Sequence, residues 1–155
     1  MSEIDTYITA VIERAGQEAR DDGSAAMEAH HLLLAIAAAE EPSLVAAGLD
    51  RDALREALDR EFARSLAAAG ATLAGRPPAS SPRTSAPPPG ATFKLALERG
   101  FQLVGRKRDL RPAHLLLGIV QAEVGTVPRA LSLAGVDPAE LAERIRQTLA
   151  APDGD

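Results

Sequence analysis

The sequence predicts an all-α protein built from two pseudo-symmetric four-helix repeats. Composition is the first indication, because only 3% of the residues are aromatic while alanine, leucine, arginine and glutamate dominate, a mixture that favours helices and an aliphatic core. The second is internal similarity: a His-Leu-Leu-Leu segment starts at His31 and again at His114, and a glycine-apolar-aspartate stop follows each, at Gly48 and at Gly135. Unlike features that recur in the same order indicate a duplicated unit.

The two repeats are separated by a segment that cannot be helical. Residues 75–91 are rich in proline and serine, and each proline restricts the residue before it away from helical angles. We therefore predict a single domain over residues 1–155, with repeat 1 at 4–74, a linker at 75–91 and repeat 2 at 92–150. A chain of this length can bury a core of its own.

The first repeat begins with an amphipathic helix over residues 4–22, whose apolar positions recur at intervals of three and four. A second helix follows at the His-Leu-Leu-Leu segment, and because it is apolar nearly all round we expect it to be buried. A short third helix leads to Gly48, which suits a left-handed cap, and Asp50 is placed to cap a closing helix. That closing helix is expected to bury Leu54, Leu58 and Phe62.

The second repeat contains the same elements in the same order. Its second helix, from His114, again carries three leucines, and we expect it to pair with its counterpart at the centre of the molecule. Gly135 and Asp137 repeat the two cap positions, and Pro138 suits the first helical position. The closing helix is expected to bury Leu141, Ile145 and Leu149.

Charge and composition argue against several function classes. The net charge of −5 disfavours general nucleic-acid binding, which needs a broad basic face. Residues 1–75 hold 14 acidic and 6 basic side chains, a net charge of −8, and residues 76–155 hold 8 and 11, a net charge of +3. There is no cysteine and no signal-peptide pattern, and no apolar stretch approaches the ~20 residues of a membrane span. We expect a cytoplasmic protein that contacts no membrane.

Sequence motifs of catalysis are also missing. The segment from Gly100 to Gly105 lacks the lysine and the hydroxyl residue of a phosphate-binding loop. No serine lies in a nucleophile-elbow sequence. We therefore predict that the protein is not an enzyme and that it has no catalytic residues and no cofactor.

The two repeated histidines have two interpretations. His31 and His114 could be ligands or catalytic bases, but their recurrence at helix starts favours hydrogen-bonded, partly buried imidazoles that serve as structural landmarks, together with Gly48 and Gly135. Glu28, His30 and His31 together could suggest a metal. Adjacent helical residues point about 100° apart, however, and no third strong ligand is placed nearby in the sequence, so we predict no metal site.

The motifs around the histidines resemble those of a known family. Residues 110–119, LRPAHLLLGI, and residues 27–36, MEAHHLLLAI, are similar to the Clp N-terminal repeat, in which a turn precedes His-Leu-Leu-Leu and a short helix and a glycine stop follow. The similarity covers residues 4–68 and 92–149, and the duplication is itself a family trait. Among ClpA, ClpB and ClpC, the resemblance is greatest to the ClpC kind.

This resemblance implies an eight-helix domain that docks proteins for Clp chaperone-unfoldases. It implies a protein- or peptide-recognition module without an ATPase of its own, whose partners would be Clp clients, adaptors or Clp ring components, with cyclic peptides as a further class. The alternative is a free-standing decoy or regulator that binds adaptors, modified proteins or Clp-directed peptide antibiotics. Binding would use a groove between the repeats or the surface at the starts of the second helices.

The sequence departs from the family at the residue before each motif histidine. The family usually has glutamate there, which in ClpC relatives helps to bind phosphoarginine, whereas this chain has His30 and Ala113. Neither side chain supplies the acidic group that a guanidinium pairs with, although Glu28 could substitute in the first repeat. A basic cluster in the turn before the second motif consists of Arg106, Lys107, Arg108 and Arg111. A solvated turn is the favoured interpretation of that cluster, and a docking patch for an acidic partner is the alternative. The candidate binding residues are therefore Glu28, His30, Arg108, Arg111 and Ala113.

Overall fold

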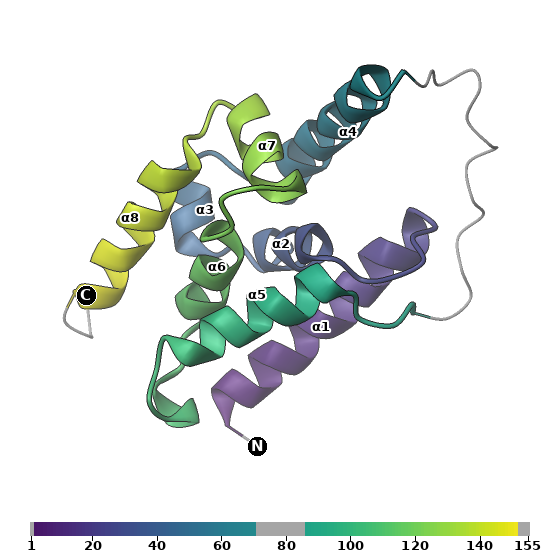
Figure 1. Ribbon diagram of the computed structural model, residues 1–155. Coiled ribbons are helices and arrows are strands. Elements are labelled where there is room, and N and C mark those ends of the chain that lie inside the picture. Colours follow the sequence, from purple (N-terminus) through teal and green to yellow (C-terminus); the bar gives the residue numbers. More distant parts are fainter. Residues whose placement is uncertain (1, 71–85, 152–155) are drawn as a thin grey trace.

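The computed structural model describes residues 2–70 and 86–151, and in these residues every regular element is helical (Figure 1). The first repeat consists of α1 (Glu3–Asp21), α2 (Ala29–Ala38), α3 (Pro42–Ala46) and α4 (Arg51–Ala68). The second consists of α5 (Ala91–Gln102), the short 3-10 helix η2 (Lys107–Asp109), α6 (Pro112–Val120), α7 (Thr126–Leu133) and α8 (Pro138–Ala150). The predicted all-α fold with eight α-helices is confirmed.

The helix ends follow the predicted cap signals. Gly48 and Gly135 have φ angles of 74° and 84°, a left-handed region that favours glycine because it has no Cβ. The Asp50 carboxylate accepts a hydrogen bond from the Ala53 N–H at 2.7 Å, and Asp137 does the same for Ala139 at 2.9 Å. In both repeats, therefore, the third helix ends at a left-handed glycine and the closing helix begins at a capping aspartate.

The core is centred on α2 and α6, which lie in the middle of the molecule in Figure 1. The three leucines that follow each motif histidine are buried, as predicted from their apolar surroundings. Helices α5 and α6 approach closely at Gly118, where an added Cβ would lie 2.5 Å from the Ala96 carbonyl oxygen and 2.6 Å from the Gly100 backbone nitrogen. Only glycine permits that packing distance.

Besides the core, contacts at several described places join the two repeats. Helix α4 of the first repeat packs along α7 of the second. The end of the predicted linker also pairs with the turn before α2: the Met27 N–H donates to the Pro88 carbonyl at 2.8 Å, and the Gly90 N–H donates to the Met27 carbonyl at 2.7 Å. Residues 75–85 of the predicted linker lie outside the described residues.

One core prediction is wrong. Leu54 and Leu58 of α4 are buried as expected, but the Phe62 side chain is 46% exposed. Helix α4 buries Ala57 and Glu61 instead against its neighbours, and Phe62 is therefore left at the surface. No helix within residues 2–70 and 86–151 has both the length and the apolar character needed to cross a membrane.

Candidate binding groove between the repeats

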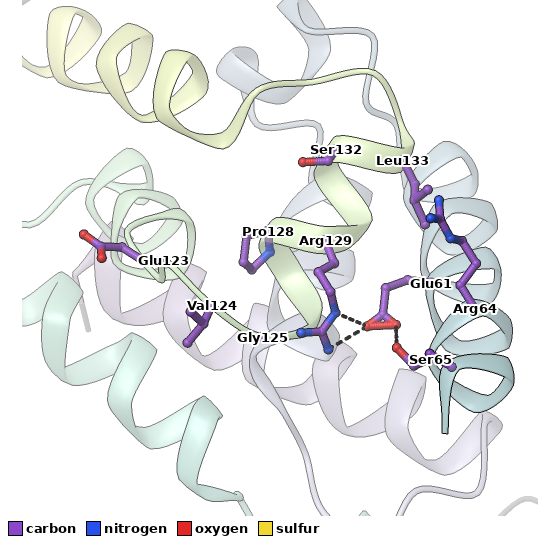
Figure 2. A pocket seen from close by; sticks show the side chains of 11 residues that line it. Glu61, Arg64, Ser65, Glu123, Val124, Gly125, Pro128, Arg129, Ser132 and Leu133 are labelled. Atoms are coloured by element: carbon purple, nitrogen blue, oxygen red, sulfur yellow. Dashed lines mark hydrogen bonds and ion pairs between the residues drawn. The ribbon is translucent and has the colours of Figure 1, made fainter. Parts of the chain in front are cut away.

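A cavity lies where α4 of the first repeat faces α7 of the second. It has a volume of about 630 Å³ and is lined by the C-terminal half of α4, by α7 and by the segment before α7 (Figure 2). Apolar side chains from both repeats, Ala68, Val124, Pro128 and Leu133, contribute to its walls. The cavity exists only because the repeats pack side by side, and neither repeat contains all of its lining.

An ion pair between the repeats stands in this cavity. Both Nε and Nη2 of Arg129 donate to Oε1 of Glu61, at 3.1 and 3.0 Å, and the Ser65 hydroxyl donates to Oε2 of Glu61 at 2.9 Å. Figure 2 shows Glu61 and Arg129 pointing toward each other from α4 and α7. Because Glu61 is only 4% exposed, its carboxylate depends on these donors for its solvation.

A second cavity of about 510 Å³ continues from the first, and the two share Glu61, Ser65 and Arg129. It extends along α4 past Phe62 to the turn before α2, where Glu28 and His30 line it. Arg55 lines it as well, with Nη2 3.0 Å from Oδ1 of Asp59.

A third, smaller cavity of about 230 Å³ adjoins both of the others. It shares Glu28 and His30 with the second cavity, and Val124 and Pro128 with the first. We call these three connected cavities the inter-repeat groove. Two exposed apolar side chains stand in it: Phe62 on α4, and Val124, which is 84% exposed, on the segment between α6 and α7.

His31, which is buried beside the groove residue His30, has both ring nitrogens engaged. Its Nδ1 accepts the Glu28 N–H at 2.8 Å, and its Nε2 lies 2.9 Å from Oδ2 of Asp22. An imidazole that accepts at Nδ1 carries its proton on Nε2, which therefore donates to Asp22. The ring itself is fully buried, so this bond holds the start of α2 against the end of α1.

A serine completes a cluster that looks like a catalytic triad in composition only. Ser24 Oγ lies 3.4 Å from the His31 Nε2, and the Ser24 hydroxyl also hydrogen-bonds to the Asp22 carboxylate. A histidine that acts as general base must offer a lone pair on one ring nitrogen to the serine hydroxyl and donate a hydrogen bond from its other ring nitrogen to the carboxylate. Here serine and aspartate meet the same protonated nitrogen, so His31 cannot accept the Ser24 proton.

The structure also brings a third potential metal ligand, Asp22, next to His30 and His31. Asp22, His30 and His31 each offer a ligand atom within 4.8 Å of the others, so Asp22 is the third group that the sequence spacing failed to place. The donor set does not fit a metal ion as arranged. His31 would have to give up either its Nε2 proton or its bond from the Glu28 N–H, because metal-bound histidine needs a lone pair.

The His30 side chain, at the start of α2, is uncharged at neutral pH. Burial lowers the pKa of His30 to about 3, and His31 and Arg55 lower it in the same direction. Burial raises the pKa of Asp22, but hydrogen bonds from His31 and Ser24 lower it more, to about 2. At neutral pH the groove therefore presents an ionised Asp22 beside a neutral His30.

The corresponding place in the second repeat is built differently. His114 Nδ1 accepts the Arg111 N–H at 2.9 Å, as its counterpart does, but the His114 ring is only partly buried. Burial and the nearby Arg111 charge lower the pKa of His114. Ala113 is buried in the core, and Arg111 donates to the Leu149 carbonyl at 3.3 Å.

The predicted basic cluster does not form one open patch. Lys107 pairs with Asp5 of α1 and holds the pKa of that carboxyl at about 2. Arg106 pairs with Asp109 at 3.2 Å, while Arg108 is exposed. Of the predicted binding residues, Glu28 and His30 therefore lie in the inter-repeat groove, whereas Arg108, Arg111 and Ala113 line none of its three cavities.

Sequence reasoning missed the residues at the centre of the groove. Glu61, Phe62, Val124 and Arg129 belong to no motif, and Phe62 was expected in the core. One signal was available: Glu61 directly precedes Phe62 and falls on the buried stripe of α4, where an acidic residue requires a cationic partner. The sequence gives no way to choose Arg129 as that partner.

Comparisons with known proteins bear on the fold. A scan against protein-family models and a search of curated proteins find no match. Among solved structures, the chain is similar to the N-terminal domain of the caseinolytic protease associated chaperone ClpD from Arabidopsis thaliana, with a TM-score of 0.66. The two chains are 20% identical, and the similarity covers 97% of this chain and 95% of that one. The chain therefore has a Clp N-terminal domain fold, while the greater resemblance to the ClpC kind stays a prediction.

Proposed function

We propose that this protein is a protein-docking module that holds a peptide segment of another protein in the inter-repeat groove. The observation that carries the proposal is the groove itself, which both repeats build and in which Phe62 and Val124 expose apolar surface. The Clp N-terminal domain fold supports a protein partner. The proposed partners are Clp clients, adaptors or ring components in the cytoplasm.

The shape and chemistry of the groove suit an extended peptide better than a small metabolite. Apolar wall segments alternate with charged groups along α4 and α7, and the cavities are connected along the length of α4. Peptide grooves recognise apolar side chains through such pockets and orient the chain through a few polar groups. We propose binding without catalysis, because the Ser24, His31 and Asp22 cluster has no base aimed at the serine.

The test is a binding experiment with groove and control variants of the whole chain. Fluorescently labelled peptides from Clp clients and purified Clp adaptors are titrated against the protein and against Phe62→Ser and Val124→Ser. Matched controls are Phe101→Ser and Val45→Ser, because Phe101 is 42% and Val45 is 58% exposed and neither lines the groove. Circular dichroism melting verifies that each variant is folded.

The expected result is that the groove variants weaken binding by about tenfold, the effect of losing one well-packed apolar contact, while the controls bind as the parent does. Weaker binding by Phe101→Ser with unchanged binding by Phe62→Ser would place the docking surface on α5 and overturn the proposal. Failure of every peptide and adaptor to bind at high protein concentration would also overturn it.

A further inference from the structure

The smallest cavity of the groove has apolar walls and one carboxylate. Ala122, Val124, Val127 and Pro128 form the apolar walls, and Glu28 lies at the start of α2. A cavity of about 230 Å³ is of the size of one long side chain. An aliphatic stem with a polar tip fits such a lining, because long cationic side chains bury their methylene groups and keep the charged head at a polar group.

The Glu28 carboxylate is held in place by neighbours that leave its charge uncompensated. The Thr92 hydroxyl donates to Oε1 of Glu28 at 2.8 Å, and Thr92 Oγ1 in turn accepts the Ala29 N–H at 2.9 Å. Gly90 leaves room for the carboxylate, since a Cβ there would lie 2.5 Å from the same Oε1. Among the described residues, no lysine or arginine forms an ion pair with Glu28.

The other carboxylates that line the second cavity already have cationic partners. Arg129 pairs with Glu61 at 3.0 Å, and Arg55 pairs with Asp59 at 3.0 Å and with Asp22 at 3.6 Å. Glu28 is thus positioned, partly buried and without a described cation. The first 75 residues, to which it belongs, carry a net charge of −8 from 14 acids and 6 bases, which attracts a basic ligand to this part of the surface.

We propose that this cavity, the Glu28 pocket, receives a lysine or arginine side chain of the bound peptide. The stem would lie along Val124 and Val127, and the cationic head would pair with the Glu28 carboxylate that Thr92 orients. The inference rests on the proposed function, because the basic side chain arrives on a peptide held in the groove. It adds a preference for a positive charge at one position of that peptide.

The experiment varies the ligand and the protein independently. Short peptides with one central position occupied by lysine, arginine, norleucine or glutamate are compared on the parent protein by fluorescence anisotropy. Norleucine keeps the aliphatic stem of lysine and removes the charge. On the protein side, Glu28→Gln removes the charge but keeps an oxygen that can accept from Thr92, and Glu13→Gln is the control, because Glu13 is exposed on α1 and lines none of the three cavities.

We expect lysine and arginine peptides to bind about tenfold more tightly than norleucine peptides, because a charge-assisted hydrogen bond at a partly buried site contributes about that much. Glu28→Gln should abolish this difference, Glu13→Gln should retain it, and added salt should reduce it. Backbone amide shifts of Thr92 and Val127 on titration should accompany binding of the basic peptides.

Equal affinity for lysine and norleucine peptides, with binding still lost in Phe62→Ser, would overturn the Glu28 pocket and leave the docking function standing. An unchanged lysine preference in Glu28→Gln, or an equal loss of that preference in Glu13→Gln, would also overturn it, because the charge recognition would then lie outside this cavity. Absence of binding by all four peptides would instead contradict the proposed function itself.

Discussion

Removing the Arg129 guanidinium should destabilise the protein measurably, because it leaves the buried Glu61 carboxylate without its cationic partner. Glu61 is 4% exposed and receives two of its three described hydrogen bonds from Arg129. Breaking one side of a buried ion pair costs about 3–5 kcal/mol. The Arg129 side chain is 56% exposed, so water can reach the Glu61 carboxylate once the guanidinium is removed. We therefore expect Arg129→Ala to lower the free energy of unfolding by about 2 kcal/mol. In a domain of this size that is a fall in Tm of about 6 °C.

The assay is urea unfolding followed by circular dichroism, for Arg129→Ala, Glu61→Gln and the double variant. A double-mutant cycle isolates the coupling, and the double variant should be more stable than Arg129→Ala because the buried charge is absent. Arg146→Ala is the control: it breaks an exposed pair with Glu143 at 3.5 Å, and should change stability by less than about 0.5 kcal/mol. The reasoning is refuted if Arg129→Ala costs no more than Arg146→Ala.

Two further predictions concern His30 and Gly118. Burial lowers the pKa of His30 from 6.5 to about 3, so as the pH falls the unfolded chain binds a proton there before the folded chain does. The contribution of His30 to stability is therefore complete above pH 6.5 and is lost as the pH drops toward 3. His30→Gln should flatten the pH dependence of the unfolding free energy between these values, and an unchanged slope would contradict the prediction. Gly118→Ala should cost about 2 kcal/mol or more, since its Cβ would meet backbone atoms of α5 at 2.5 Å, whereas Gly105→Ala, with open space around it, should be nearly neutral in the same urea titration.

Sequence reasoning succeeded where the signal was local. The left-handed glycines at Gly48 and Gly135 and the capping aspartates at Asp50 and Asp137 depend on a few neighbouring residues, and the structure has them as predicted. The burial of α2 and α6 followed from runs of leucine that leave no polar face. The same features recur in both repeats, so each prediction was supported twice.

Sequence reasoning failed where side chains from distant elements meet. Phe62 was expected to be buried because it extends the apolar spacing of Leu54 and Leu58, but helix α4 packs against α7 through Glu61 and leaves Phe62 exposed. Asp22 was not recognised as a partner of His31, because the two are brought together by the angle between α1 and α2 rather than by a motif. Glu28 was a candidate by its charge alone, and Thr92, its hydrogen-bond donor, lies in the other repeat.

The sequence by itself determined the helices, their ends, the duplication and the central leucines, because hydrophobic periodicity and capping act over a few residues. Only the tertiary structure decided how the two repeats meet. Packing α4 of the first repeat against α7 of the second forms the inter-repeat groove, pairs Glu61 with Arg129 and places Glu28 beside Thr92. Those contacts depend on the relative position of two units with similar sequences, and the free energy that sets that position is a sum over the whole core rather than a property of any one segment.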